Sequence, residues 1–240
     1  MRPDPGPGSG LAWQPSLFAP GGAADDGRTG LSFDGLVRHR LGTRSWVDYV
    51  PHWLPRHDEL FEYLRREGDW RRRRRHMYDR VVAEPRLVAS WPVPGAAASG
   101  EPDGAVPALP AELERVRTAL GHRYGVSFDS ILVNLYRDGR DGVAWHRDTV
   151  RRRLPEPVVA TVSLGARRRF LLRRYGGGPM ALQLEPGEGD LVVMGGACQH
   201  EYEHTVPKEP ARRPTVGGAR MSITLRHSHP PLSPAAEPGR

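Results

Sequence analysis

From Phe128 onward the chain consists of short β-rich runs separated by turns that contain glycine and proline. The runs are SILVNLYR, VVATVSLG, RRFLLRR, MALQLEPGEGDLVVMGG and ARMSITLRH, and the turns include RDGRDG, YGGGP and EPGEGD. Many short strands at close spacing favour a β-sandwich or a β-barrel. Helical patterns stand only before this region, so the sequence predicts an α+β fold with the sandwich or barrel in its C-terminal half.

Two helices are predicted in the first half of the chain. Apolar residues recur at helical spacing over residues 55–67, and Gly68 supplies a stop signal. The stretch AELERVRTALGHRYG, from residue 111, places three apolar side chains on one face, which predicts an amphipathic helix closed by Gly121. The stretches SWVDYV and HMYDRVVAEPRLVASW are strand-like, and residues 92–110 are predicted to form a flexible loop.

Composition divides the chain into one domain and two tails. Residues 1–30 and 229–240 are rich in proline, glycine and alanine, bury too little apolar surface to offset chain entropy, and are predicted to be disordered. Residues 31–228 are predicted to form one domain, with an N-terminal extension over 31–127 and the β core over 128–228.

The charge of the chain favours a polyanionic partner. The net charge is +7, nearly all of it from arginine, so nucleic acid is the first candidate. The alternative is an arginine-rich composition without electrostatic meaning.

No run of 18 apolar residues is present, and we expect a cytoplasmic, monomeric protein with no membrane partner. The single Cys198 excludes an intrachain disulfide and a multi-cysteine zinc site, and is expected to be a small buried residue.

The stretch GVAWHRDTV carries His146 and Asp148 two residues apart. On an extended segment such residues point to the same side, so both can reach one ion. GGACQHEYEHTVP offers His200 and His204 as a third ligand, and two histidines with one carboxylate form the facial triad of non-haem Fe(II) oxygenases. The alternative is an ordinary loop histidine. A protein-kinase interpretation of HRD fails, because no glycine-rich phosphate loop or D-F-G accompanies it.

A second polar face is predicted on the strand RMSITLR. Alternation places four polar residues on one side and three apolar residues on the other; the polar ones are Arg220, Ser222, Thr224 and Arg226. An inward-facing arginine is costly unless it meets an anion, and a dicarboxylate lying along this face would supply one. The alternative is an edge strand with its arginines in solvent. Asn134 and Tyr136 also share a face and can hydrogen-bond a carboxylate or keto oxygen.

Together these motifs resemble the AlkB family of Fe(II)/2-oxoglutarate dioxygenases, and most closely its nucleic-acid demethylase branch. The resemblance rests on N-x-Y, a glycine-rich turn, H-x-D, a distant histidine followed by x-V-P, and two arginines six residues apart on a terminal strand, all in the family's order. PRLVASW and SLGARRRF also lie in that order, and the resemblance covers Leu31 to His227. It implies a double-stranded β-helix (jelly-roll) core with N-terminal helices packed against it.

The resemblance also implies the ligands of the site. His146, Asp148 and His204 would bind Fe(II), with His204 preferred over His200 because it precedes TVP. Five residues would contact 2-oxoglutarate, namely Asn134, Tyr136, Arg220, Ser222 and Arg226. Arg220 would pair with the distal carboxylate, and Arg226 would lie near the metal. O2 would be the second co-substrate.

The implied reaction removes methyl groups as formaldehyde from 1-methyladenine and 3-methylcytosine in DNA, or in RNA. A methyl group on the pairing edge is buried in a duplex, so the base must be flipped out or single-stranded. Val150 stands where many members of the family carry an acid. A dioxygenase acting on a protein or a small molecule is therefore the alternative, whereas a non-catalytic binding protein is disfavoured because every metal and co-substrate position is filled.

Arginine runs supply candidate phosphate contacts. The resemblance places a substrate lid within residues 31–127, after WRRRRRHMYDR, where Arg71–Arg75 would hold phosphates and Trp70 or Tyr78 would lie near the bases. Arg151–Leu154 and Arg167–Arg174 are further candidates. For each run the alternative is a solvated arginine cluster.

Overall fold

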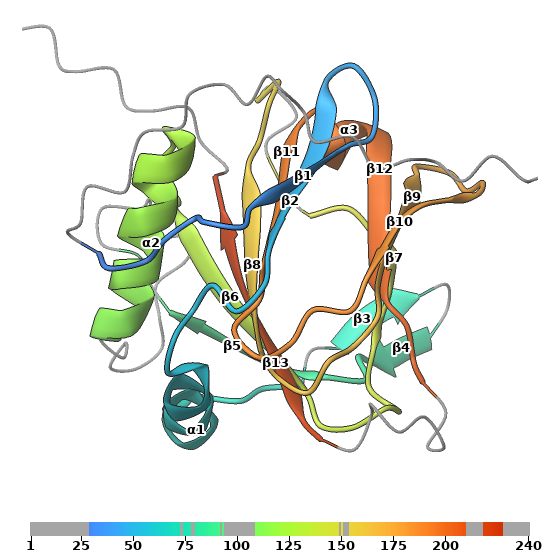
Figure 1. Ribbon diagram of the computed structural model, residues 1–240. Coiled ribbons are helices and arrows are strands. Elements are labelled where there is room, and N and C mark those ends of the chain that lie inside the picture. The colour runs from blue at the N-terminus through green and yellow to red at the C-terminus, as the bar shows by residue number, and fades with distance from the viewer. Residues whose placement is uncertain are drawn as a thin grey trace, which may run out of the picture.

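The computed structural model describes residues 29–72, 74–77, 80–91, 93, 109–148, 150, 154–209 and 218–227. Figure 1 shows two facing antiparallel sheets, with two long helices on the outer side of the larger sheet. The predicted tails, apart from residues 29 and 30, and most of the loop predicted over 92–110 lie outside the described residues. The predicted tail ends too late, because Thr29 is buried and its carbonyl oxygen accepts a hydrogen bond from Arg115.

The larger sheet contains seven strands in the order β1-β2-β11-β8-β13-β6-β5, and every pairing in it is antiparallel. Its strands are β1 (Val37–Arg40), β2 (Ser45–Val50), β5 (Leu87–Trp91), β6 (Ser130–Tyr136), β8 (Val159–Gly165), β11 (Leu191–Gly196) and β13 (Arg220–Arg226). β13 lies between β8 and β6, so the edge-strand alternative for RMSITLR is excluded.

The smaller sheet has the order β10-β9-β12-β7. Its strands are β7 (Val143–His146), β9 (Phe170–Arg174), β10 (Met180–Leu184) and β12 (Tyr202–Val206), and the short helix α3 (Cys198–Glu201) leads into β12. From β6 to β13 the chain passes back and forth between the sheets, which is the winding of a double-stranded β-helix. The predicted α+β fold with a jelly-roll core is confirmed, although β1 and β12 were not expected from the sequence.

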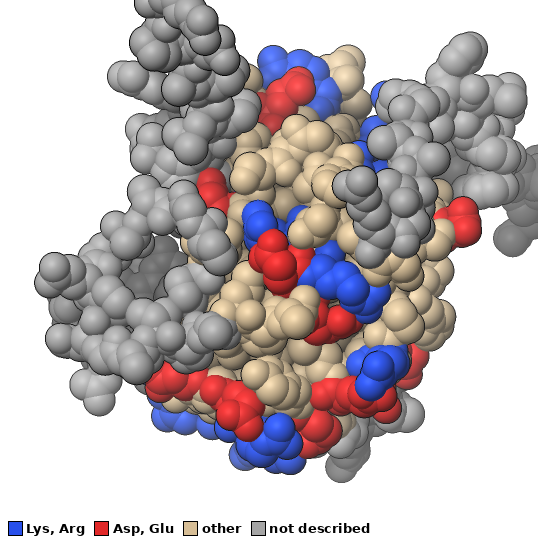
Figure 2. Space-filling view, turned by 90° about the vertical axis from the view of Figure 1, so that its left-hand side faces the viewer, with Lys and Arg blue, Asp and Glu red and all other residues tan. Residues whose placement is uncertain are grey.

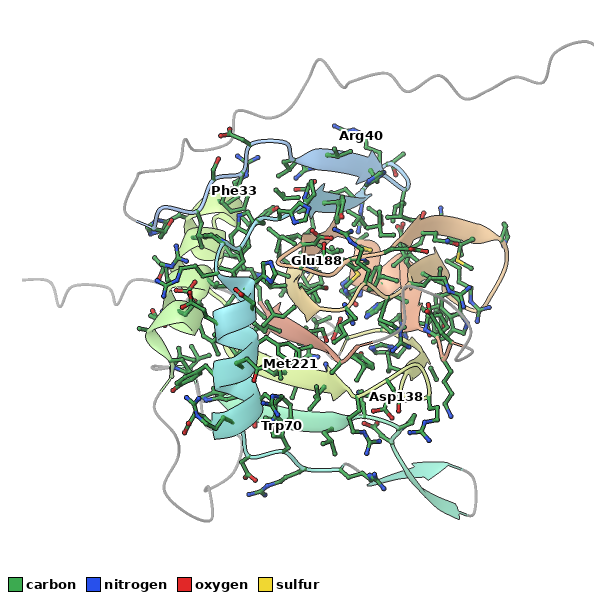
Figure 3. All side chains as sticks on the ribbon, turned by 60° about the horizontal axis from the view of Figure 1, so that its bottom comes forward. Phe33, Arg40, Trp70, Asp138, Glu188 and Met221 are labelled. Atoms are coloured by element: carbon green, nitrogen blue, oxygen red, sulfur yellow. The ribbon has the colours of Figure 1, made fainter. Side chains whose placement is uncertain are left out.

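The helices cover the outer face of the larger sheet. Both α1 (His57–Glu67) and α2 (Ala111–Tyr124) bury leucines in one apolar cluster with the core-facing side chains of β13. Each such leucine contributes about 1.5–3 kcal/mol when it is fully buried. The predicted start of the first helix at residue 55 is two residues early, because Arg56 adopts a left-handed conformation with φ 53°. The predicted stop of the second helix at Gly121 is wrong, because the helix continues to Tyr124 and ends at Gly125, which has φ 65°. Figure 3 shows Trp70 just beyond the end of α1, where it packs partly against this cluster.

A separate hairpin consists of β3 (Arg74–Met77) and β4 (Arg80–Ala83). Figure 3 shows it projecting from the body of the protein. The sequence predicted one strand, a turn and another strand over HMYDRVVAEPRLVASW, whereas the structure has three strands here, including β5. The short turn that joins β4 to β5 faces the space between the two main sheets, because Glu84 and Arg86 line the cavity there.

Candidate active site

Two strands of the smaller sheet bring three candidate metal ligands together. His146 ends β7 and His204 lies on β12, and the antiparallel register places these two residues directly opposite each other. Asp148 follows β7 by two residues. One ligand atom from each of His146, Asp148 and His204 lies within 4.8 Å of the others. The predicted triad therefore converges, in the arrangement that leaves open positions on an Fe(II) ion.

The carboxylate of Asp148 is held so that its two oxygens face different partners. Arg226 donates from Nε and Nη2 to Oδ1 at 2.9 and 2.7 Å. Oδ2 lies 3.5 Å from Nε2 of His204, and the backbone N–H of Asp148 donates to Oε1 of Gln199 at 2.9 Å. Burial raises the pKa of Asp148, but Arg226 and the two histidines outweigh it and hold that pKa at about 2. The ligand is therefore ionised at neutral pH.

His204 is in the neutral form that binds a metal, and a hydrogen bond fixes the tautomer of His146. Burial, followed by the neighbouring His146, lowers the pKa of His204 to about 3, so its imidazole is neutral. Nδ1 of His146 lies 2.9 Å from the carbonyl oxygen of Ala144, which can only accept, so Nδ1 carries the proton and Nε2 is left as the ligand atom. Nε2 of His200 lies 2.8 Å from the carbonyl oxygen of Leu154, outside the cluster. The geometry thus favours His204 over His200.

Between the sheets lies a cavity of about 1130 Å³, and the polar face of β13 forms part of its wall. The lining side chains from this strand are Arg220, Ser222, Thr224 and Arg226. The three residues between them, Met221, Ile223 and Leu225, pack into the apolar cluster under the helices. The alternation predicted from the sequence is therefore present, with the arginines inside the protein rather than in solvent.

Arg220 is a buried cation in need of an anion. It is 1% exposed, and its Nη2 donates to Oγ of Ser163 at 2.8 Å. Its Nε and Nη1 find no hydrogen-bond partner among the described residues. Burial lowers its pKa. Because a guanidinium binds a carboxylate through two parallel hydrogen bonds, Arg220 fits one end of a dicarboxylate.

Asn134 and Tyr136 lie beside this strand on β6, where the register places them opposite Ser222 and Arg220. Nδ2 of Asn134 donates to Oγ of Ser222 at 3.3 Å, and Oδ1 of Asn134 accepts from Nε of Arg86 at 2.9 Å. Tyr136 is buried, and its ring centroid lies 5.3 Å from Cζ of Arg220. All five residues predicted to contact 2-oxoglutarate therefore lie along one wall of one cavity.

Sequence reasoning missed Gln199 and Arg86. The side-chain oxygen of Gln199 accepts a hydrogen bond from the backbone N–H of Asp148, and Arg86 donates a hydrogen bond to the side-chain amide oxygen of Asn134. The only signal for Arg86 was its place in PRLVASW, and no pattern in the sequence marked Gln199. Both act through contacts between residues more than 40 positions apart, which a local pattern does not reveal.

Residues 47–226 match the family model described as the 2OG-Fe(II) oxygenase superfamily. The chain belongs to this superfamily. Its members use Fe(II), 2-oxoglutarate and O2, so the predicted cofactors are confirmed. The chain carries an Fe(II)/2-oxoglutarate oxygenase domain, and the residues described above fit both groups: the cluster of His146, Asp148 and His204 for the metal, and the guanidinium donors of Arg220 that lack a partner among the described residues for the co-substrate.

Named relatives confirm the resemblance to the AlkB family. The chain is 31% identical over 185 residues to the alpha-ketoglutarate-dependent dioxygenase alkB homolog 3 of Bos taurus, covering 72% of this chain and 62% of that protein. It is 28% identical over 218 residues to the DNA oxidative demethylase ALKBH2 of Arabidopsis thaliana, covering 78% of this chain and 67% of that protein. The solved structure of OsALKBH1 shares the fold, with a TM-score of 0.57, 18% identity, and coverage of 80% of this chain and 99% of that chain.

The arginine runs fit their predicted role less well than the metal and co-substrate residues do, because many of these arginines are paired or buried within the protein. Most of Arg167–Arg174 is already paired, because Arg167, Arg169 and Arg173 contact carboxylates and Arg168 is 1% exposed. Arg168 donates to the carbonyl oxygens of Asp138, Asp141 and Pro207, so its assignment as a phosphate contact is wrong. Figure 3 labels Asp138 on the loop that Arg168 holds.

Other candidates are tested only in part. Arg71 and Arg72 are exposed, and Arg71 pairs with Asp69. Of the other arginines in this run, Arg74 and Arg75 are described only in their backbone, and Arg73 lies outside the described residues. Tyr78 and Arg151–Arg153 also lie outside the described residues. Val150 lines the cavity, so the position where the family often has an acid faces the substrate space without charge.

Cys198 is buried as expected, and burial raises the pKa of its thiol to about 12. Among the described residues, no helix combines the length and the apolar character that crossing a bilayer requires.

Proposed function

We propose that this protein is an Fe(II)/2-oxoglutarate-dependent demethylase that repairs 1-methyladenine and 3-methylcytosine in DNA or RNA. The observation that carries the proposal is the common cavity, in which the His–Asp–His cluster and the guanidinium of Arg220 face the same space. Two donors of that guanidinium, Nε and Nη1, have no partner among the described residues. A volume of about 1130 Å³ leaves room for a flipped base beside a small dicarboxylate. The similar protein from Bos taurus, alkB homolog 3, is named an alpha-ketoglutarate-dependent dioxygenase, which supports the proposed chemistry. The similarity spans 62% of the length of that protein.

The rim of the cavity supports a nucleic-acid substrate. Arg147 lines the cavity, is exposed, and has its Cζ 3.7 Å from the ring centroid of Tyr175, which is 59% exposed. Trp145 also lines the cavity and stacks with Arg173 at 4.0 Å. Exposed aromatic rings and guanidinium groups are the usual platform for unstacked bases and their phosphates. The Arg147 side chain, between two metal ligands in sequence, thus points to the rim.

The helix-bearing face is a poor candidate for this role. Figure 2 shows acidic and basic residues interspersed on it. Many of them form ion pairs within α1 and α2, including Arg65–Glu62 and Arg117–Glu114. A surface on which the charges neutralise each other gives little attraction for a phosphate backbone. The rim of the cavity is therefore the proposed docking side.

Each part of the site has a role in the proposed reaction. Bound Fe(II) with 2-oxoglutarate and O2 supplies the oxidising power that hydroxylates the methyl group, and the hydroxymethyl group leaves as formaldehyde. Arg226 holds Oδ1 of Asp148 and so leaves Oδ2 for the metal. Arg220 anchors the distal carboxylate of 2-oxoglutarate, while Asn134 and Tyr136 shape the wall beside it. Burial of these groups keeps bulk water away from the reacting atoms.

Two measurements test the proposal. Under anaerobic conditions, Fe(II) and 2-oxoglutarate together are expected to give a weak visible charge-transfer band that disappears in His146→Ala. Absence of the band in the natural protein would remove the metal assignment. In air, an oligonucleotide with one 3-methylcytosine is expected to release formaldehyde in step with consumption of 2-oxoglutarate. Consumption without demethylation would instead favour a protein or small-molecule substrate.

The cytoplasmic location and the monomeric state stay predictions. Binding to single-stranded DNA is expected to weaken as salt rises, because phosphate contacts release counterions. An affinity that does not depend on salt would contradict the role given to the rim arginines.

A further inference from the structure

The cavity holds one carboxylate that the metal site does not use. Among the described residues that line it, only Glu84 and Asp148 are acidic, whereas four are arginines: Arg86, Arg147, Arg220 and Arg226. Asp148 is committed to the metal cluster and to Arg226. Glu84 is therefore the one acidic group in the described lining that remains for a substrate.

Glu84 is partly buried and incompletely satisfied. Its side chain is 17% exposed, and Nη2 of Arg86 lies 3.0 Å from its Oε2 as an ion pair. The geometry of this contact does not make a hydrogen bond, and Oε2 has no hydrogen-bond partner among the described residues. The ion pair with Arg86 balances the charge of Glu84 but leaves Oε2 without a hydrogen bond among the described residues, so this oxygen can accept one from a ligand.

The backbone around Glu84 is fixed on both sides. The carbonyl oxygen of Pro85 accepts from the N–H of Gly142 at 3.1 Å, just before β7 leads to the metal ligands. Arg86 donates to Asn134, which in turn donates to Ser222 on the co-substrate wall. The turn that carries Glu84 is thus hydrogen-bonded to Gly142, next to β7 of the smaller sheet, and to Asn134 on β6 of the larger sheet. Glu84 lines the same cavity as the metal ligands and Arg220.

We propose that Glu84 is the residue that selects positively charged bases, by accepting a hydrogen bond from the exocyclic amino group of the flipped base. This inference rests on the proposed function. 1-Methyladenine and 3-methylcytosine carry a positive charge at neutral pH and present an amino group on the modified edge. 3-Methylthymine is neutral and presents a carbonyl oxygen at the same place, which a carboxylate repels. In a cavity with an excess of arginines, one anion decides whether a cation enters.

Glu84 could instead serve only to hold Arg86. The variant Glu84→Gln separates the two roles, since it keeps the size and an acceptor oxygen but removes the charge. A purely structural role would change the affinity for charged and neutral bases alike, whereas a selective role changes only the ratio between them.

The test is anaerobic binding of labelled oligonucleotides to protein loaded with Fe(II) and 2-oxoglutarate, so that no turnover is needed. Three single strands differ at one base, which is 3-methylcytosine, 3-methylthymine or cytosine. We expect the natural protein to prefer 3-methylcytosine over 3-methylthymine, and Glu84→Gln to reduce this preference roughly 10- to 100-fold, as for a hydrogen bond between charged groups. Glu62→Gln, at an exposed position on α1, is the matched control and should keep the preference.

Circular dichroism and affinity for unmodified cytosine report the folding of Glu84→Gln. A preference that stays within about twofold of the natural value overturns the role of Glu84, even where formaldehyde release supports the proposed function. An equal loss of affinity for all three strands overturns it too, and leaves Glu84 a structural partner of Arg86. Failure of the natural protein to release formaldehyde from any methylated strand overturns the proposed function and, with it, this inference.

Discussion

Arg220 should destabilise the protein until an anion binds, and replacing it should therefore have two effects of opposite sign. The proposed change is Arg220→Met, which keeps a long unbranched side chain and removes the charge. We expect the variant to be more stable than the natural protein in the absence of 2-oxoglutarate. We also expect it to lose the further stabilisation that 2-oxoglutarate gives.

The magnitude follows from the contacts of Arg220. Its guanidinium is fully buried with one hydrogen bond, to Ser163, while Nε and Nη1 find no partner in the described part of the chain. Replacing even a paired buried charge and its partner by apolar side chains of similar volume is often neutral or stabilises a protein by about 1–4 kcal/mol, because the charges no longer need to be desolvated. Loss of the bond to Ser163 costs about 1 kcal/mol. The net expectation is an increase of up to about 3 kcal/mol, or roughly 2–4 °C in Tm for each kcal/mol.

The ligand response runs the other way. At a concentration of 100 Kd, 2-oxoglutarate should stabilise the natural protein by about 2.7 kcal/mol. Removing one partner of a buried charge pair costs about 2–5 kcal/mol of binding, so the variant should bind 2-oxoglutarate at least about 30-fold more weakly. Its stabilisation at the same concentration then falls below about 1 kcal/mol.

Urea unfolding with and without 2-oxoglutarate, followed by tryptophan fluorescence, measures both effects. Arg140→Met is the control, because Arg140 is 90% exposed and should change neither quantity. A variant that is less stable than the natural protein without ligand would refute the argument that Arg220 is an unsatisfied charge. An undiminished response to 2-oxoglutarate would refute its role as the carboxylate anchor.

Three further predictions concern buried groups. Arg168→Met should destabilise the protein by about 3–5 kcal/mol in urea unfolding, because it strips three main-chain carbonyls of their donor, unlike the change at Arg220. Cys198 should react with iodoacetamide at pH 8 only after unfolding, since burial raises its pKa to about 12; rapid labelling of the native protein would contradict its burial. In metal-free protein the pKa of His204 is lowered from 6.5 to about 3. Between these pH values the unfolded chain therefore binds a proton at His204 that the folded protein does not bind. Its contribution to stability is complete above pH 6.5 and is lost as pH falls toward 3, and His204→Gln should flatten the pH dependence of the urea midpoint.

The parts of the site that the sequence predicted are those with a short-range pattern. The alternation of RMSITLR divided β13 into a polar and an apolar face, because side chains alternate with period two along a strand. It left open whether the polar face lay in solvent at a sheet edge, and the position of β13 between β8 and β6 excludes that alternative. His146 and Asp148 followed from the same rule. The choice of His204 depended on the resemblance, since nothing local separates it from His200; the structure supports the choice because only His204 lies in register with His146.

Contacts across long loops were beyond the reach of the sequence. Glu84 and Arg86 look like ordinary turn residues, and their place in the cavity depends on hydrogen bonds of this turn to Gly142, just before β7, and to Asn134 on β6. The start of α1 was misplaced for a local reason, because Pro55 signals a first turn while the left-handed Arg56 delays it.

The charge of the chain was the least specific of the sequence signals, and Arg168 shows why. Its run, SLGARRRFLLRR, reads as a basic patch, yet Arg168 is buried under three carbonyls and its neighbours Arg167 and Arg169 are bound to Glu188 and Glu209. A net charge of +7 therefore says little about where a phosphate would bind, because paired and buried arginines add to the sum but not to the surface field.

Arg147 contributes more to that field although it stands alone in sequence, since it is exposed at the cavity rim and is held by an aromatic ring rather than by a carboxylate. Arg147→Ala should reduce the slope of log Kd against log salt for DNA binding by about the contribution of one phosphate contact, close to one unit. An unchanged slope would move the docking surface away from the rim.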